Sequence, residues 1–234
     1  SYYFSAAYLA DDGIIENSGF ERISSRINVD YQAKKWLKFG VNLSYANVKS
    51  RYPGDQDTDA ATSSGNAFFV GNFIAPIYPM YVRNAEGQIM HDANTGYRIY
   101  DYGDGESTNF TRNFMSMSNP MSSFLYDTEE YLMDILNGKW YAKVDILDGL
   151  SLTASLGLHV DNTRLHIVGN KYYGQSASQN GSVQQYSSRT YSLDQQYLLT
   201  YKKAFDVHHI DILAGYESMD YNTESHYILG YNMY

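Results

Sequence analysis

The chain has 234 residues with 17 Lys and Arg against 26 Asp and Glu, and the resulting net charge of −9 argues against a broad nucleic-acid surface. It contains no cysteine, which excludes both a disulfide framework and a thiolate metal site. A mean hydropathy of −0.45 and the absence of a continuous apolar run of about 18 residues exclude a membrane-spanning helix, but not a membrane barrel, whose alternating strands average out as polar.

Alternation of apolar and polar residues at period two predicts seven strands. In residues 36–48 the apolar positions are Leu37, Phe39, Val41, Leu43 and Tyr45. The expected strands cover about residues 2–10, 20–32, 36–48, 139–146, 150–161, 191–203 and 210–216.

The connections between these strands alternate in length. Short connections are expected at residues 33–36, around Gly149 and at residues 205–209, and long ones after the first strand, from about 51 to 130 and from 169 to 188. An up-and-down meander with tight turns at one end and long loops at the other is the layout of an outer-membrane barrel. We therefore predict an all-β, antiparallel, up-and-down transmembrane β-barrel with long extracellular loops. The alternative is a secreted, tyrosine-rich β-sandwich that binds glycans or acts as an adhesin, with long loops at both ends of its sheets.

The two faces of the strands predict two environments. The apolar face is expected to contact lipid, and the charged face suits a wet lumen. The residues expected to face the lumen are Arg22, Arg26, Asn28, Asp145 and Asp211. Aromatic residues near the tight turns favour an interfacial belt over a strand-end packing cluster, and these are Tyr31, Trp36, Phe39, Tyr201 and Phe205.

Seven strands are too few and of the wrong parity for closure, because single-chain bacterial barrels use an even number of strands and an open edge in lipid leaves backbone groups unsatisfied. We therefore expect the chain to be one arc of a larger barrel, interrupted within a strand at "YILGYNMY". The alternative is that Tyr234 is the aromatic terminus usual for outer-membrane barrels.

Several segments resemble one family. "FSAAYLADDGIIENSGFERISSRINVDYQAKKWLKFGVNLSYA" contains an acidic-Gly-Ile turn at residues 12–14, an Arg-x-Asn strand at Arg26 and Asn28, and a "KKWLKFGVNL" turn at residues 34–43. "APIYPMY", "NP" at Asn119 and Pro120, "LDGLSLTASLG" and "HHIDILAGYE" follow in the same order. The chain resembles the barrel of the SusC/RagA-type TonB-dependent transporters over nearly its whole length.

That resemblance implies an importer in the outer membrane of a Gram-negative bacterium, with a barrel of about 22 strands closed by a plug. It also implies oligosaccharide or peptide substrates, a SusD-like surface lipoprotein as a lid, and energy coupling to TonB through segments not in this chain. Residues 1–234 are expected to belong to a single barrel domain, without the plug and the N-terminal domains.

Two stretches of the longest loop are candidate binding surfaces. "TGYRIYDYGDGES" groups tyrosines with aspartates, which suits stacking on sugar rings and hydrogen bonding to hydroxyls. Its candidate substrate-binding residues are Tyr97, Tyr100, Asp101, Tyr102 and Asp104. "AFFVGNFIAPIYPMY" at residues 67–81 is a candidate docking surface for the lid. In both cases the alternative is a loop that packs on itself.

No pattern of residues predicts catalysis or a cofactor. The six histidines include no HExxH, no serine lies in a GxSxG elbow, and no carboxylate pair suggests a glycosidase. Asp55, Asp57 and Asp59 alternate as in a calcium loop, but Ala60 and Asn66 stand where an EF-hand requires Gly and Glu. We expect a solvated acidic loop there, with a looser calcium site as the alternative.

Overall fold

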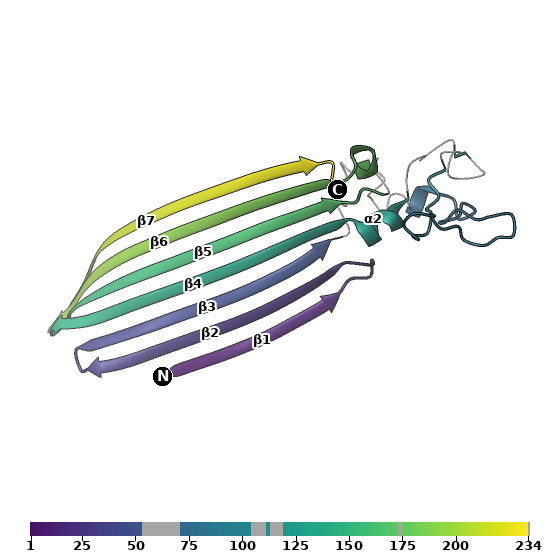
Figure 1. The fold of residues 1–234 in the computed structure, drawn as a ribbon. Helices are drawn as coiled ribbons and strands as arrows, with labels where there is room; N and C mark the ends of the chain where they lie inside the picture. Colours follow the sequence, from purple (N-terminus) through teal and green to yellow (C-terminus); the bar gives the residue numbers. More distant parts are fainter. Residues whose placement is uncertain (53–70, 104–110, 113–118, 173–174, 234) are drawn as a thin grey trace.

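The strands of the computed structural model form a single seven-stranded antiparallel sheet in which the order along the chain is the order in space (Figure 1). The structure describes all residues except 53–70, 104–110, 113–118, 173–174 and 234. The strands are β1 (Tyr2–Asp12), β2 (Gly19–Lys34), β3 (Leu37–Tyr52), β4 (Thr128–Leu147), β5 (Leu150–Gly169), β6 (Ser182–Phe205) and β7 (His208–Tyr231). A short helix, α2 (Pro120–Tyr126), and a 3-10 helix, η2 (Gln175–Gln179), lie in the connections. The predicted up-and-down meander is confirmed.

Long and short connections are segregated to opposite ends of the sheet. Residues 35–36, 148–149 and 206–207 make the tight turns at one end, and residues 13–18, 53–127 and 170–181 make the connections at the other (Figure 1). Gly149 has a φ of +80°, which favours glycine, and its carbonyl accepts a hydrogen bond of 2.8 Å from the Lys202 amide. The predicted alternation of loop lengths is thus a property of the fold.

Several strands are longer than the sequence pattern predicts. β4 already begins at Thr128, β6 begins at Ser182 inside the expected loop 169–188, and β7 continues to Tyr231. His208 and His209 begin β7 instead of forming the turn. Ladder hydrogen bonds need no apolar alternation, so polar segments such as "SVQQYSSR" extend the strands where periodicity gives no signal.

The pairing register aligns the apolar positions across the sheet. Val41 lies between Val29 and Trp140, and Trp140 lies opposite Leu156. On the other face, Asn42 lies between Asn28 and Lys139. We call these the apolar face and the polar face. Since a shift of one residue would exchange the two faces, the alignment over the four strands β2 to β5 shows that the register keeps them separate.

The apolar face extends over only part of each strand. On β4 it runs from Leu136 to Val144, which at about 3.4 Å per residue is roughly 27 Å along the strand. A strand tilt of about 40° reduces this to a height of roughly 21 Å, close to the apolar band of about 25 Å in membrane barrels.

Toward the long loops the two faces exchange character. The apolar face reaches a row of polar residues that runs across four strands: Asn47, Asp134, Asn162 and Arg189. Beyond it this face carries charge, and the opposite face becomes apolar. One row there is apolar apart from Ser50, and it contains Phe20, Tyr131, Leu165, Tyr186 and Tyr227. Each of these strands thus has a segment beyond the apolar band in which the same face carries polar and charged side chains.

Among the described residues, the few buried apolar side chains lie in the long connection and at the loop end of β3. They are Val48, Val82, Tyr100, Tyr102 and Phe124. Val48 and Ser50 lie on the polar face of β3, in its segment near the long loops, and both are less than a tenth exposed. Most other strand side chains remain partly exposed because the described residues contain one sheet and not a second layer.

Among the helices in the described part of the chain, none is long and apolar enough to cross a membrane.

Candidate functional site

The residues predicted to face a lumen all lie on the polar face. The register places Arg22, Arg26 and Asn28 on the polar face of β2, and Asp145 and Asp211 on that of β4 and β7. Near the tight turns this face carries three ion pairs, Lys38–Asp30 (3.7 Å), Lys143–Asp145 (3.3 Å) and Lys202–Asp211 (2.7 Å). The residues share one face, as the sequence pattern requires; that this face borders a lumen stays a prediction.

On the polar face, a contact between Tyr141 and Asp30 requires a glycine on the strand between them. Asp30, Gly40 and Tyr141 occupy one row on β2, β3 and β4. The Tyr141 ring lies over Gly40, and its hydroxyl donates a hydrogen bond to Asp30. A Cβ at Gly40 would lie 2.1 Å from Cε1 of Tyr141. The glycine of the "WLKFGVNL" segment therefore makes room for a ring that links three strands.

The tyrosines of the candidate substrate-binding stretch form part of a packed ring cluster. Tyr100 is 1% exposed and contacts Tyr81 and Tyr126 at ring-centroid distances of 5.1 and 5.9 Å. Burial raises the pKa of the Tyr100 hydroxyl, since removal from water disfavours the phenolate. Tyr102 is also buried, and its hydroxyl shares a hydrogen bond with Ser122.

Only part of that stretch is accessible to a ligand. Asp101 is 5% exposed and accepts a hydrogen bond of 2.8 Å from the Gly103 amide. Tyr97 is 41% exposed and continues the cluster through Tyr172 of the β5–β6 connection, at 5.7 Å. Asp104 lies outside the described residues. The burial of Tyr100, Asp101 and Tyr102 is what is expected of a loop that packs on itself. Among the described candidate residues, the prediction of stacking on a sugar ring therefore applies to Tyr97 alone.

The Asn-Pro pair noted in the sequence holds the long connection together. Asn119 is buried, and its side-chain amide donates to the carbonyls of Met80 and Asp101, at 2.9 Å each. Its Oδ1 accepts a hydrogen bond of 3.3 Å from the Met121 amide, so it caps α2, with Pro120 at the first helical position.

Asp127 joins the three connections at the loop end. Its Oδ1 accepts hydrogen bonds from the backbone and side-chain amides of Asn170, at 2.8 and 2.5 Å, and its carbonyl accepts one of 3.4 Å from Asn17. Sequence reasoning missed this contact, because no pattern joins residues so far apart along the chain.

The candidate docking stretch is described from Gly71 onward. Phe73, Ile77 and Met80 are 59, 84 and 44% exposed. Beside them, Ile74, Pro76, Pro79 and Met121 border a pocket of about 190 Å³. Exposed apolar groups next to an apolar pocket are features of an interaction surface, so the docking interpretation stays a prediction. The possible calcium loop at residues 55–59 lies outside the described residues.

Side-chain contacts between strands stabilise the polar row at the loop end of the apolar face, the row that contains Asn47 and Asp134. Tyr45 and Asn47 donate to Oδ1 of Asp134 at 2.7 and 2.8 Å, and Arg164 contacts its Oδ2 at 3.3 Å. One step further, Lys49 and Arg51 both contact Glu130, at 2.8 and 3.1 Å. Sequence reasoning missed this network, although the abrupt end of the apolar alternation in β3 and β4 signalled it.

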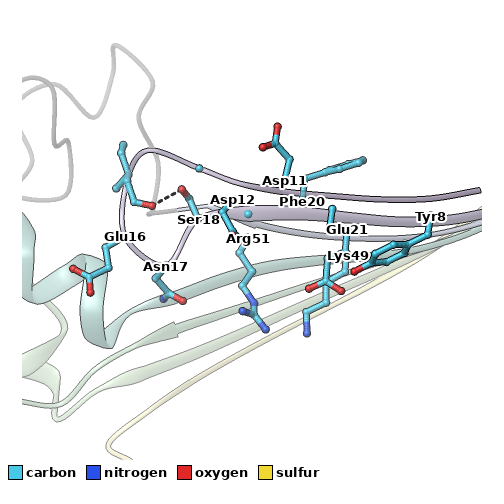
Figure 2. Close-up of a pocket in the computed structure, with 14 residues that line it drawn as sticks. Tyr8, Asp11, Asp12, Glu16, Asn17, Ser18, Phe20, Glu21, Lys49 and Arg51 are labelled. Carbon is cyan, nitrogen blue, oxygen red and sulfur yellow. Dashed lines mark hydrogen bonds between the residues drawn. The ribbon is translucent and has the colours of Figure 1, made fainter.

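The β1–β2 connection borders a pocket of about 450 Å³ (Figure 2). The Gly13 amide donates to the Ser18 carbonyl at 3.0 Å, and Ser18 Oγ to the Ile15 carbonyl at 2.5 Å. A Cβ at Gly13 would lie 2.0 Å from Ser18 Oγ, which explains the glycine of the acidic-Gly-Ile turn. The pocket has mixed charge, with carboxylates beside Lys49 and Arg51.

In the part of the chain that the structure describes, there is no group of three or more His, Asp or Glu side chains that could hold a metal ion.

Comparison with known proteins identifies relatives. No family model matches the chain. It is 27% identical over 216 residues to TonB-dependent receptor P3 of Formosa agariphila, covering 92% of this chain and 19% of that protein. It is 28% identical over 236 residues to TonB-dependent receptor SusC of Bacteroides thetaiotaomicron, covering 94% and 21%.

Two solved structures share the fold. The RagAB peptide transporter has a TM-score of 0.65 at 20% identity, covering 99% of this chain and 24% of that chain. The RagAB peptide importer in its closed-closed state has a TM-score of 0.66 at 20% identity with the same coverage.

The fold and these relatives define the class. The seven-stranded sheet matches part of the barrel of a TonB-dependent receptor, a class of outer-membrane β-barrel proteins and not of enzymes. Within that class, the chain is similar over nearly its whole length to one segment of receptors of the SusC/RagA type. It spans about a fifth of the length of the curated relatives it matches.

Proposed function

We propose that the chain forms one arc of the barrel wall of an active importer in the outer membrane, which takes up oligosaccharides, glycans or peptides. In this proposal residues 1–234 belong to a single barrel domain, and the plug and the TonB-contacting segments lie in other parts of the protein. The apolar face borders lipid and the polar face borders the lumen.

The observation that supports this proposal most strongly is the separation of the two faces within one sheet of seven long strands. The height of the apolar band is close to that of the apolar band in membrane barrels, and the faces exchange character beyond it. A secreted sandwich would instead cover its apolar face with a second sheet. The sequence similarity to SusC and the fold shared with the RagAB peptide transporter support nutrient import as the class of activity.

The loop end is the proposed entry side. The exposed apolar residues Phe73, Ile77 and Met80 form the proposed docking surface for a SusD-like lipoprotein lid. Tyr97 and Tyr172 present partly exposed rings beside the same loops, where a sugar or an apolar peptide side chain can stack.

Uptake by cells that carry or lack the full-length receptor tests the activity. Radiolabelled oligosaccharide and peptide mixtures should accumulate only in cells with both the receptor and an intact TonB system, because import against a gradient requires energy. Equal accumulation in both strains, or receptor found outside the outer-membrane fraction, would contradict the proposal.

Copurification tests the docking surface. Phe73→Ser combined with Ile77→Ser should reduce recovery of the lipoprotein partner with the receptor, whereas Ile14→Ser, another highly exposed apolar residue at the loop end, should not. Undiminished recovery with the double variant would exclude this surface.

A further inference from the structure

The polar face carries two kinds of cationic residue. Near the tight turns, Lys38, Lys143 and Lys202 each pair with an aspartate within 4 Å. Further toward the long loops, Arg22 and Arg26 are exposed, and among the described residues neither has an ion pair or a side-chain hydrogen bond. In a chain with a net charge of −9, this leaves a locally positive segment of the face.

The two arginines share one hollow. A pocket of about 350 Å³ is lined by both guanidinium-bearing residues together with Ser24, Ser44 and Asn137. The lining therefore combines positive charge with neutral hydrogen-bonding groups. The residues come from β2, β3 and β4, so the pocket is built on strands and not on a loop.

A third cation extends this segment along the sheet. The row beside Arg26 contains Asn28, Asn42 and Lys139, and it borders a second hollow of about 330 Å³. The lining of this hollow also includes Asp30, which is paired with Lys38. Lys139 is exposed, and no described acidic side chain lies within ion-pair distance of it. We call Arg22, Arg26 and Lys139 with these two hollows the cationic strip.

We propose that the cationic strip binds carboxylate groups of the transported molecule, so that the importer favours acidic cargo. This inference rests on the proposed import function. A planar guanidinium presents paired N–H donors that match the two oxygens of a carboxylate, and serine and asparagine side chains suit the hydroxyls or amides beside it. Spaced cations along a strand suit a chain with repeated carboxylates better than a single small anion.

Binding to the full-length receptor in detergent tests this assignment with matched probes. One pair is hexagalacturonate and its methyl ester, and the other is hexaglutamate and hexaglutamine. Each pair keeps the backbone and removes the charge, so the two pairs separate sugar from peptide cargo. The variants are Arg22→Gln with Arg26→Gln, and the control is Lys143→Gln, which removes a cation that already has an aspartate partner.

We expect the charged member of at least one pair to bind about tenfold more tightly than its neutral partner, less so at high salt, and the arginine double variant to abolish this preference. The control variant should retain the preference. No preference in the native receptor, or a preference that survives in the double variant, would overturn the proposal.

The unfolding temperature of the ligand-free receptor distinguishes cargo binding from a structural role of the arginines. If the double variant lowers this temperature more than Lys143→Gln does, and no probe pair shows a charge preference, the arginines hold an acidic segment of the receptor itself and the cargo assignment is wrong. Energy-dependent uptake of any substrate without a charge preference would overturn only this inference and leave the proposed import function standing.

Discussion

At the scale of single residues, Gly40 has a structural role that the sequence pattern does not predict. Gly40 leaves the space in which the Tyr141 ring crosses β3 to reach Asp30. The need for this glycine is invisible in the strand pattern, because alternation predicts which face a position occupies but not what lies above it on the neighbouring strand.

Gly40→Ala should therefore destabilise the barrel by about 1–3 kcal/mol, since the added methyl group displaces the ring. Gly157→Ala is the matched control, because Gly157 lies within the sheet on β5 and a Cβ there comes no nearer than 3.3 Å to another atom. The midpoint of urea unfolding of the full-length receptor in micelles measures both. If Gly40→Ala costs no more than Gly157→Ala, the packing role of Gly40 is wrong.

A second residue-scale prediction concerns Asp92 in the turn at residues 92–96. Hydrogen bonds from the Thr95 amide (2.8 Å), the Asn94 amide (2.9 Å) and the Thr95 hydroxyl (3.0 Å) hold the pKa of the Asp92 carboxyl below its usual value. Since the folded pKa is lowered, the ionised carboxylate stabilises the turn above the unfolded pKa of about 3.9, and this is lost as the pH falls through the folded value.

Hydrogen exchange of residues 90–99, corrected for the intrinsic rate, should thus show protection that is constant near pH 5 and lost below about pH 4. Asp92→Asn should show weaker protection near pH 5 and no acid transition. Identical pH profiles for the two proteins would rule out the carboxylate as the cause.

At the scale of elements, α2 and its cap hold together described parts of the long β3–β4 connection. Asn119 makes two hydrogen bonds to carbonyls from separate parts of the loop and caps the helix. Asn119→Ala removes all three and leaves buried carbonyls without these donors, which should cost about 1–3 kcal/mol locally.

Because this loss is confined to the loop, limited proteolysis of intact cells should cleave within residues 71–127 faster in Asn119→Ala than in the native receptor, with the unfolding midpoint of the barrel unchanged. Asn84→Ala, whose side chain bonds only within its own exposed turn, provides the control. Equal cleavage rates for Asn119→Ala and Asn84→Ala would contradict the cap's role.

A further prediction at this scale concerns the environments of the two faces of a strand. Leu156 lies on the apolar face opposite Trp140, and its neighbour Ser155 lies on the polar face opposite Tyr141. Leu156→Arg should cost about 2–4 kcal/mol in the bilayer, whereas Ser155→Arg should cost little. Refolding of the receptor into lipid vesicles measures both variants, and equal penalties would count against the assignment of faces.

At the scale of the whole molecule, the sequence predicts the meander, the number of strands and the segregation of loops, because each follows from local alternation and spacing. It misses the ends of β4, β6 and β7, where polar segments continue the ladder without an apolar signal. It also places Tyr100 and Tyr102 among ligand contacts, although they are buried. Composition cannot separate a tyrosine that packs a loop from one that meets a ligand, since both need an apolar ring with a polar end.

Contacts between aligned strands also explain why the strands extend beyond the apolar band. The contacts of Asp134 and Glu130 form where the apolar face gives way to polar and charged residues, and the opposite face becomes apolar near the long connection. If the apolar face borders lipid, the exchange of faces marks the level at which the wall leaves the hydrocarbon, a property of aligned strands that a single strand's sequence does not reveal.

The central claim is that the apolar face borders lipid and the polar face borders water. Residues 1–234 contain no cysteine, so single cysteines introduced along β5 from Leu150 to Arg164 can carry spin labels in the full-length receptor in vesicles, once any cysteine in its other segments has been replaced. We predict accessibility to oxygen at even positions through Val160 and to a water-soluble nickel chelate at odd positions, with even positions switching to the chelate from Asn162 onward. Uniform accessibility along the strand, or oxygen accessibility at the odd positions, would contradict this assignment of the two faces.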